Sequence, residues 1–167
     1  MQAASRARAG DWLIFAAGPI AIAILALWLG QSTSWDLRHY HWYNPYALLH
    51  GRIAFDAAVA HHATYYNPLI DLPLWLVGNI APATVAAAFL GLVQGLNFSF
   101  LYLIARDALS PALVLRRPLA GLLAGLGVAG GYAVILTGTT YYDNVVSVPV
   151  LAALWLIVRD RVLLDAG

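Results

Sequence analysis

Long apolar segments, separated by shorter polar ones, dominate the hydrophobic pattern of this chain. Four of them carry no charged residue and cover residues 12–29, 83–105, 119–137 and 145–158. A helix needs about 20 mostly apolar residues to cross a bilayer. The first three segments have this length, and the fourth gains a turn from residues 139–144. The pattern predicts an all-α fold, in which residues 1–167 form one membrane domain, a polytopic transmembrane helix bundle of about four spans.

The first apolar segment could also belong to a secretory signal peptide, since Arg6 and Arg8 precede it. It is longer than the usual apolar region of such a peptide, and no small-residue cleavage motif follows before Trp35. We therefore expect a helix that is retained as a membrane anchor.

Residues 31–82 form a long, more polar loop with short helices of its own. Pro and Asn punctuate it: Asn44-Pro45 and Asn67-Pro68 can each open a helix, and Gly51 can follow the end of the first. Asp56 can cap a further one. We predict short helices at 45–50, 57–63 and 68–80 lying at the outer membrane interface. Segment 68–80 is apolar, but at ~20 Å it is too short for a comfortable span.

Composition agrees with a membrane location. Hydrophobic residues make up 62% of the chain and charged residues 10%, whereas about 25% of the residues in soluble domains are charged. The net charge is +1 and no basic patch accumulates, which excludes a nucleic-acid partner. The chain has no Cys, so disulfides and thiol chemistry are excluded as well.

The arginines predict the orientation of the bundle. They form three clusters: Arg6 and Arg8; Arg106, Arg116 and Arg117; Arg159 and Arg161. With four spans, all three clusters fall on one side, and basic loops face the cytoplasm. Both termini are then cytoplasmic, and residues 31–82 and 138–144 are outside, with only Arg38 and Arg52 against this assignment.

Glycines crowd the third apolar segment at a spacing that lets helices approach closely. Gly121 and Gly125 form one such pair, and Gly127 and Gly131 form another. Packing within the chain and a dimer face are both compatible with this pattern.

All five histidines lie in the first loop, among many Trp and Tyr residues. Aromatic rings of this kind anchor a protein at the bilayer interface or stack against a substrate. His39 and His41 would share one face of a strand and could then hold a metal ion, although two ligands are too few for a complete site. No cofactor is specified, and a divalent metal stays an open alternative.

Two aspartates stand at the outer ends of the predicted spans. Asp36 follows the first span, where a carboxylate is costly unless it is paired or functional. It can pair with Arg38 or Arg52, end a helix, or act as a general base or metal ligand toward a lipid-borne substrate. Asp143, in the second outer loop, can cap the fourth span or supply a second acidic group.

Three stretches together resemble a known family: SWDLRHYHWYNPYALLHGR at 34–52, YYNPLIDLP at 65–73 and GTTYYDNV at 138–145. The chain resembles the GT-C superfamily of membrane glycosyltransferases, and within it bacterial proteins of the glycosyltransferase family 87 type. This resemblance implies a multi-pass protein of the bacterial cytoplasmic membrane that transfers a sugar from a polyprenyl-phosphate donor to an acceptor at the outer face. It implies Asp36 as catalytic base, and it gives as substrate-binding candidates Arg38, His41, Tyr43, Asn44, Arg52, Asn67 and Asp143.

The number of spans departs from this family, whose members usually have eight or more. We therefore expect the N-terminal part of a larger enzyme, completed by further transmembrane helices of the same or another chain. Its expected partners are the lipid-linked donor and membrane lipids. The alternative is a non-catalytic membrane scaffold or a subunit of a larger complex. An ion pathway is disfavoured because the apolar segments contain no charge.

Overall fold

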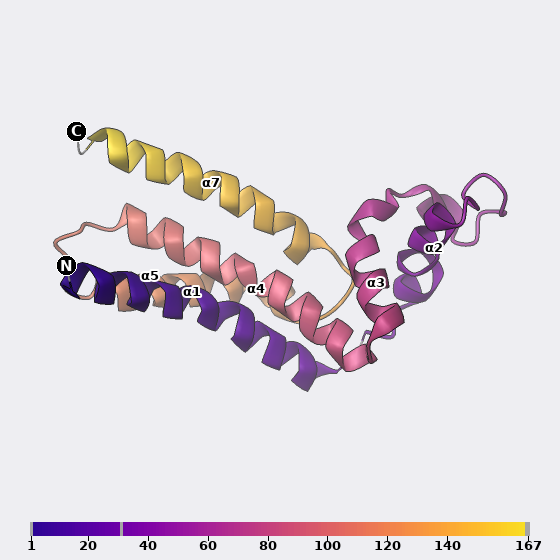
Figure 1. Cartoon of the computed structure of the whole chain (residues 1–167), viewed down its shortest axis with the longest axis horizontal. Helices are drawn as coiled ribbons and strands as arrows, with labels where there is room; N and C mark the ends of the chain where they lie inside the picture. Colours follow the sequence, from indigo (N-terminus) through magenta and orange to yellow (C-terminus); the bar gives the residue numbers. More distant parts are fainter. Residues whose placement is uncertain (1, 31, 166–167) are drawn as a thin grey trace.

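The computed structural model describes residues 2–30 and 32–165, with side chains for residues 10–30 and 32–161. Its described part consists of helices and connecting loops and contains no strand, which confirms the all-α prediction. Four longer helices lie side by side: α1 (Gln2–Leu29), α4 (Ala83–Ala108), α5 (Arg116–Val128) and α7 (Asp143–Asp165). The short helices of the first loop gather at one end, and both termini lie at the other (Figure 1).

Two of these helices are long and apolar enough to cross a membrane: the Gly10–Leu29 part of α1, and α4 over Ala83–Ala108. The core helix of a soluble protein would be mostly buried, but only 22% of the apolar window of α1 and 44% of that of α4 are buried. On α1, large side chains such as Leu13, Ile24 and Trp28 face outward. An apolar surface of this extent marks contact with lipid or another protein. The two helices therefore indicate a membrane location.

Helices α1 and α4 pack with their backbones almost in contact. A Cβ atom added at Gly95 would lie 2.4 Å from Pro19 Cα, and one at Gly91 would lie 2.6 Å from Ala23 Cα. By contrast, a Cβ at Gly125 of α5 would meet nothing within 4 Å. The tight packing predicted from glycine spacing thus exists within the chain, and its closest backbone contacts involve the Gly91–Gly95 pair of α4. Of the glycines singled out in 119–137, Gly127 also packs closely, since an added Cβ would lie 2.9 Å from Leu101 Cδ1.

The predicted third span is not one helix. Helix α5 ends at Val128, and a separate five-residue helix, α6 (Gly131–Ile135), follows it. The break falls at Ala129 and Gly130, where Gly130 has an extended ψ of 135°. Adjacent Gly130 and Gly131 favour this break because glycine stabilises a helix poorly.

The second loop, residues 136–142, folds back against α4. Gln94 Oε1 accepts a hydrogen bond from Gly138 N at 2.7 Å, and Gln94 Nε2 donates to Thr139 O at 3.1 Å. Asn97 Nδ2 donates to Asn144 O at 2.5 Å. Asn97 lies about 21 Å along α4 from its first residue at ~1.5 Å per residue, so α7 begins beside the middle of α4. This position explains why the fourth apolar segment is short.

The first loop contains a five-residue π-helix η1 (Leu37–His41), α2 (Tyr43–Leu49), two 3-10 helices η2 (His61–Tyr65) and η3 (Pro68–Ile70), and α3 (Leu72–Ile80). The helix expected at 45–50 is confirmed, with Gly51 at a positive φ of +66° just past its end. The helix expected at 57–63 is instead η2, which begins at His61. Segment 68–80 folds as η3 and α3, with a break at Ala81 before α4, and forms no span of its own.

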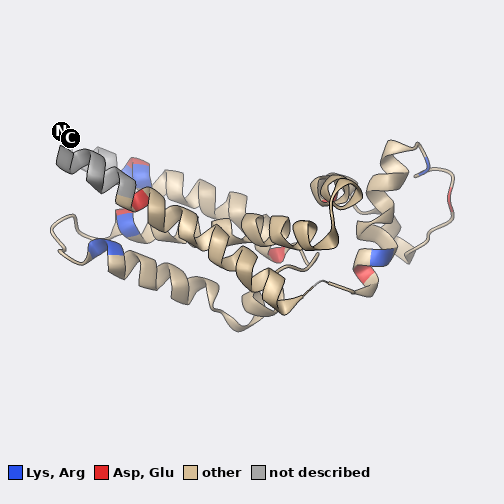
Figure 2. Ribbon diagram, turned by 60° about the horizontal axis from the view of Figure 1, so that its bottom comes forward, with Lys and Arg blue, Asp and Glu red and all other residues tan. Residues whose placement is uncertain are grey.

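Many of the charged residues of the helices lie at the end of the bundle where the termini lie (Figure 2). We call this the arginine end; its described members include Arg106, Arg116, Arg117 and Arg159. The opposite end, formed by residues 32–82 and 136–142, is called the loop end. The arginine cluster around the connection from α4 to α5 and the one near the end of α7 therefore share one end, as the orientation argument requires. The side chains of Arg6 and Arg8 lie outside the described ones.

Candidate functional site

The loop end brings together three segments that are far apart in the sequence: η1, Asp71 ahead of α3, and Tyr141-Tyr142 ahead of α7. The π-helix begins directly after Asp36 and places Tyr40 and His41 on the next turn. Short π-helical turns are rare and often occur at functional sites. These residues form the candidate site, which consists of Asp36, Tyr40, His41, Asp71, Tyr141 and Tyr142.

A buried acid–histidine pair joins two of these segments. His41 Nδ1 lies 2.7 Å from Asp71 Oδ1, and their side chains are only 8% and 3% exposed. Hydrogen bonds between groups that are buried to this degree are strong, because little water competes for them. The pair fixes η1 against the start of α3.

Two tyrosines surround this pair. The ring of Tyr142 packs edge-on against His41, with the ring centroids 4.9 Å apart. The centroid of the Tyr40 ring lies 4.1 Å from that of His41. Burial, followed by the charge of Asp71, raises the pKa of Tyr142, and burial with the charge of Asp36 raises the pKa of Tyr40 to about 12. Both hydroxyls therefore stay protonated at neutral pH and can donate hydrogen bonds, but neither can serve as a base.

Of the two carboxylates of the site, Asp36 has fewer contacts with other protein groups than Asp71. Ser34 Oγ, rather than Asp36, accepts the hydrogen bond from Leu37 N, at 3.2 Å. Its neighbour is Tyr141, whose pKa is raised mainly by its hydrogen bond to Asp36 and then by the charge of that carboxylate. Among the described side chains, no ion pair joins Asp36 to Arg38 or Arg52, so that alternative for Asp36 is wrong in this structure.

The other carboxylate named from the sequence, Asp143, is the first residue of α7 and is exposed. It follows Tyr141 by two positions, so it lies on the same side of the bundle as Asp36. At the N-terminus of a helix a negative charge is favourable.

Several predicted binding residues instead hold the first loop together. Arg52 Nε donates to Asp56 Oδ2 at 2.8 Å, and the Tyr43 hydroxyl donates to the same carboxylate. These contacts, Arg52 first, lower the pKa of Asp56. Asp56 is therefore an ion-pair partner here, where a helix cap was expected.

Two asparagines of the first loop differ in their roles. Asn67 caps η3 as predicted, since its Oδ1 accepts a hydrogen bond from Leu69 N at 3.0 Å. Asn44 caps nothing, because α2 already begins at Tyr43; it is buried, and its Nδ2 donates to Ala63 O at 2.9 Å. This bond ties α2 to η2.

Arg38 is exposed and lines a groove of about 250 Å³ between α2 and α3, together with Trp42, Tyr46, Trp75 and others. Its guanidinium has no carboxylate partner among the described side chains. A phosphate could be bound at such a position.

The two histidines considered as metal ligands point to different partners. His39 Nδ1 contacts Trp35 O at 2.8 Å, and the two rings stack, whereas His41 faces Asp71. The segment is helical and not a strand, so residues i and i+2 do not share a face. Among the side chains of residues 10–30 and 32–161, no group of three His, Asp or Glu is arranged to hold a metal ion.

Sequence reasoning missed Asp71 and Tyr142 as members of this site. Asp71 lies within the apolar segment 68–80. A carboxylate in such a segment needs a partner, and that need was the available signal. The partner, His41, could not be identified because it is 30 positions away.

Comparisons with protein-family models, with curated proteins and with solved structures found no match to this chain. The structure and the site thus define a helical bundle with two helices of membrane-spanning length and a polar, aromatic site at one end. Any specific activity for this site is a proposal.

Proposed function

We propose that this chain is a membrane glycosyltransferase module that transfers a sugar from a polyprenyl-phosphate donor to an acceptor hydroxyl at the outer face of the bacterial cytoplasmic membrane. One observation carries the proposal most: Asp36, at the junction of the two loops, has a hydrogen-bonding tyrosine beside it and no cationic partner among the described side chains. A carboxylate in this setting is available to accept a proton.

The proposed topology has four membrane crossings. Helices α1 and α4 supply two, the broken unit of α5 and α6 a third, and α7 a fourth. Irregular backbone is tolerated at membrane depth where the protein satisfies its polar groups. Gln94 and Asn97 do this for Gly138 N, Thr139 O and Asn144 O, in the connection from α6 to α7. The arginine end is then cytoplasmic by the positive-inside rule, and the loop end faces outward.

In the proposed reaction Asp36 takes the proton of the acceptor hydroxyl. The oxygen of that hydroxyl attacks the anomeric carbon of the sugar at the same time. The bond between that carbon and the phosphate oxygen breaks, and polyprenyl phosphate leaves. A positioned general base contributes roughly 10²–10⁴-fold in rate. Tyr141 lies beside Asp36, and Arg38, which lines the groove between α2 and α3, would bind the donor phosphate there.

Replacing Asp36 by Asn tests this proposal, since it keeps the side-chain size and removes the basicity. The assay is transfer of labelled sugar from a polyprenyl-phosphate donor in membranes that contain the chain and the further helices with which it assembles. We expect a loss of roughly 10²–10⁴-fold. The matched control is Asp56→Asn, a first-loop carboxylate already committed to Arg52 and Tyr43, which should retain activity within a few-fold. Near-normal transfer by Asp36→Asn would rule out the base.

A non-catalytic scaffold is the second candidate, and the surface of α5 favours it. Gly125 is open, and neighbouring Leu122 and Leu126 are 60% and 64% exposed. Such an apolar strip suits contact with another helix. A scaffold would lose its assembly when Leu122 and Leu126 are changed to bulky Trp, and would be indifferent to Asp36→Asn.

A further inference from the structure

A second cavity lies at the arginine end, on the opposite side of the bundle from the candidate site. Its volume is about 290 Å³, and three helices form its walls. Helix α1 contributes Trp12 and Phe15, α4 contributes Phe100 and Leu103, and α7 contributes Trp155. The rings contact one another around it: Phe15 lies 5.6 Å from Trp12 and 6.2 Å from Phe100, centroid to centroid. This aromatic groove is suited to a hydrocarbon chain.

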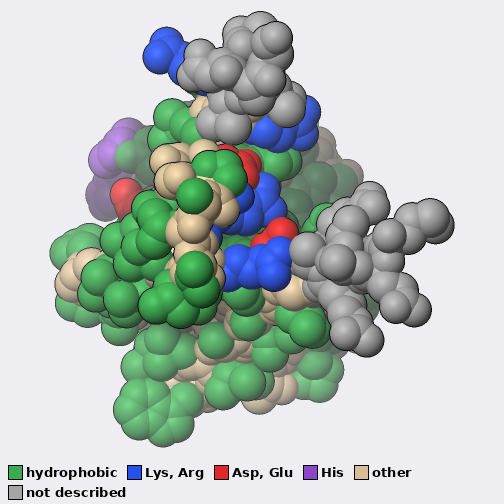
Figure 3. All heavy atoms as spheres, turned by 90° about the vertical axis from the view of Figure 1, so that its left-hand side faces the viewer, with side chains coloured by type: hydrophobic (Ala, Val, Ile, Leu, Met, Phe, Trp, Pro, Cys, Tyr) green, Lys and Arg blue, Asp and Glu red, His purple; other side chains and the backbone are tan. Residues whose placement is uncertain are grey.

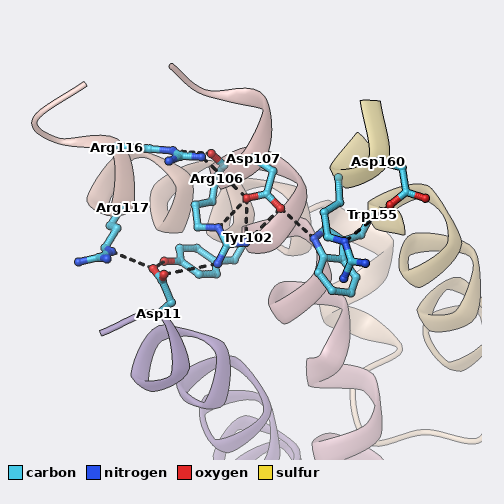
Figure 4. A network of polar contacts seen from close by, with 9 residues as sticks. Asp11, Tyr102, Arg106, Asp107, Arg116, Arg117, Trp155 and Asp160 are labelled. Atoms are coloured by element: carbon cyan, nitrogen blue, oxygen red, sulfur yellow. Dashed lines mark hydrogen bonds and ion pairs between the residues drawn. The ribbon is translucent and has the colours of Figure 1, made fainter. Parts of the chain in front are cut away.

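Charged side chains lie at one end of the aromatic groove, where Asp11 and Arg106 also line it. Figure 4 shows them as one connected network drawn from α1, α4, α5 and α7. Asp11 Oδ1 accepts hydrogen bonds from the Tyr102 hydroxyl at 2.7 Å and from Arg117 Nε at 2.8 Å. Asp107 accepts from Arg106 Nε at 2.8 Å and from Trp155 Nε1 at 3.0 Å. Both carboxylates are therefore already occupied by protein donors.

The arginines of this network outnumber its carboxylates. Around Asp11 and Asp107, three guanidiniums, of Arg106, Arg116 and Arg117, face two carboxylates. Arg159 pairs with Asp160, so among these described side chains one positive charge is in excess. Of the three, Arg116 has the longest contact to a carboxylate: its guanidinium lies 3.8 Å from Asp107 Oδ1. Each guanidinium has five N–H donors. Arginine side chains gather on the end face of the molecule, beside hydrophobic side chains (Figure 3). The surplus charge favours an anion there.

We propose that the aromatic groove is a binding site for an anionic phospholipid of the leaflet at the arginine end. One acyl chain lies against Phe15, Phe100 and Trp155, and the phosphate is bound by Arg106 with Arg116 beside it. Trp side chains suit this depth, because their rings lie in lipid while their N–H groups reach polar partners, as Trp155 does with Asp107. The inner leaflet supplies the anionic lipids that arginines at a membrane surface attract. This site is independent of the proposed sugar transfer and rests on the proposed orientation of the bundle.

The test measures lipid binding to the purified chain in neutral detergent by native mass spectrometry. Phosphatidylglycerol is compared with phosphatidylcholine bearing the same acyl chains. We expect phosphatidylglycerol to bind at least about fivefold better, the contribution of one arginine near a membrane surface. Arg106→Gln should remove this preference. Arg52→Gln is the matched control, since Arg52 also pairs with an aspartate but lies at the loop end, and it should keep the preference.

A second variant covers the case in which Arg106→Gln fails to fold. Arg116→Gln removes a guanidinium whose carboxylate contact is weak, and it should reduce the phosphatidylglycerol preference as well. Equal binding of the two lipids by the unmodified chain would overturn the proposal. An unchanged preference in both Arg106→Gln and Arg116→Gln would do the same, because the phosphate would then be bound elsewhere.

Discussion

The contact between α1 and α4 gives a sharp prediction for Gly95. Replacing Gly95 by Ala puts a methyl group where three backbone atoms already lie: Pro19 Cα at 2.4 Å, Pro19 N at 2.9 Å and Gly18 O at 3.0 Å. Non-bonded carbon atoms prefer about 3.5–4.0 Å. No side-chain rotation relieves this overlap, because the atoms belong to the backbone. The two helices must therefore move apart.

The cost of this movement can be bounded. Separating a well-packed pair by roughly 0.5–1 Å loses a quarter to a half of the dispersion energy at the contact, and overpacking of this kind typically costs about 1–3 kcal/mol. Alanine is favoured over glycine within a helix by up to ~1 kcal/mol, which offsets part of the loss. We expect Gly95→Ala to lower the free energy of unfolding by about 1–2 kcal/mol.

Gly125→Ala is the matched control for this variant. It makes the same chemical change within a helix, but the new methyl group meets nothing within 4 Å. Its free energy of unfolding should stay equal or rise by up to ~1 kcal/mol. Equilibrium unfolding in mixed detergent micelles, followed by circular dichroism, measures both. If Gly95→Ala were as stable as Gly125→Ala, the close α1–α4 contact would be refuted.

Two further substitutions test other parts of the fold in the same unfolding assay. Asp71→Ala leaves His41 buried without its partner and should lower the free energy of unfolding by roughly 1–5 kcal/mol, the upper end applying if the pair is ionised. Arg52→Gln, the control, breaks an exposed pair and should lower it by at most about 1 kcal/mol. Equal effects would show that burial of the His41–Asp71 pair is unimportant. Gln94→Leu removes the hydrogen-bond partners of Gly138 N and Thr139 O. It should lower the free energy of unfolding by about 1–3 kcal/mol for each polar group left unsatisfied. An unchanged free energy would mean that water or lipid headgroups reach the second loop.

Sequence reasoning located the first two apolar helices well, because their length and lack of charge leave few alternatives. The predicted 12–29 and 83–105 correspond to α1 and α4, whose loop-end boundaries, Leu29 and Ala83, coincide with the prediction. At the arginine end, α1 begins at Gln2 and α4 ends at Ala108, beyond the predicted limits. The same reasoning could not foresee the break in 119–137. Hydropathy averages over the Gly130-Gly131 step, where backbone flexibility decides the outcome.

Contacts between residues far apart in the sequence were the second feature that sequence reasoning could not predict. Glycine spacing predicts that some backbone can approach closely, but it does not identify the partner helix, and so the Gly91–Gly95 pair was overlooked in favour of those in residues 119–137. The His41–Asp71 pair has the same character, since its members belong to separate segments of one loop. Among the predicted caps, Asn67 forms one because its Oδ1 bonds a neighbouring backbone N–H. The side chains of Asn44 and Asp56 were predicted wrongly as caps because each is bound by other groups of the folded loop.

The central claim is that the loop end, with Asp36, faces outward while the arginine end is cytoplasmic. The chain has no Cys of its own, so single cysteines report position cleanly. His62→Cys lies at the loop end and Ala112→Cys lies between α4 and α5, and both positions are exposed. With a membrane-impermeant maleimide on intact cells, we predict labelling at position 62, and labelling at 112 only after the membrane is permeabilised. Labelling of position 112 on intact cells would contradict the account.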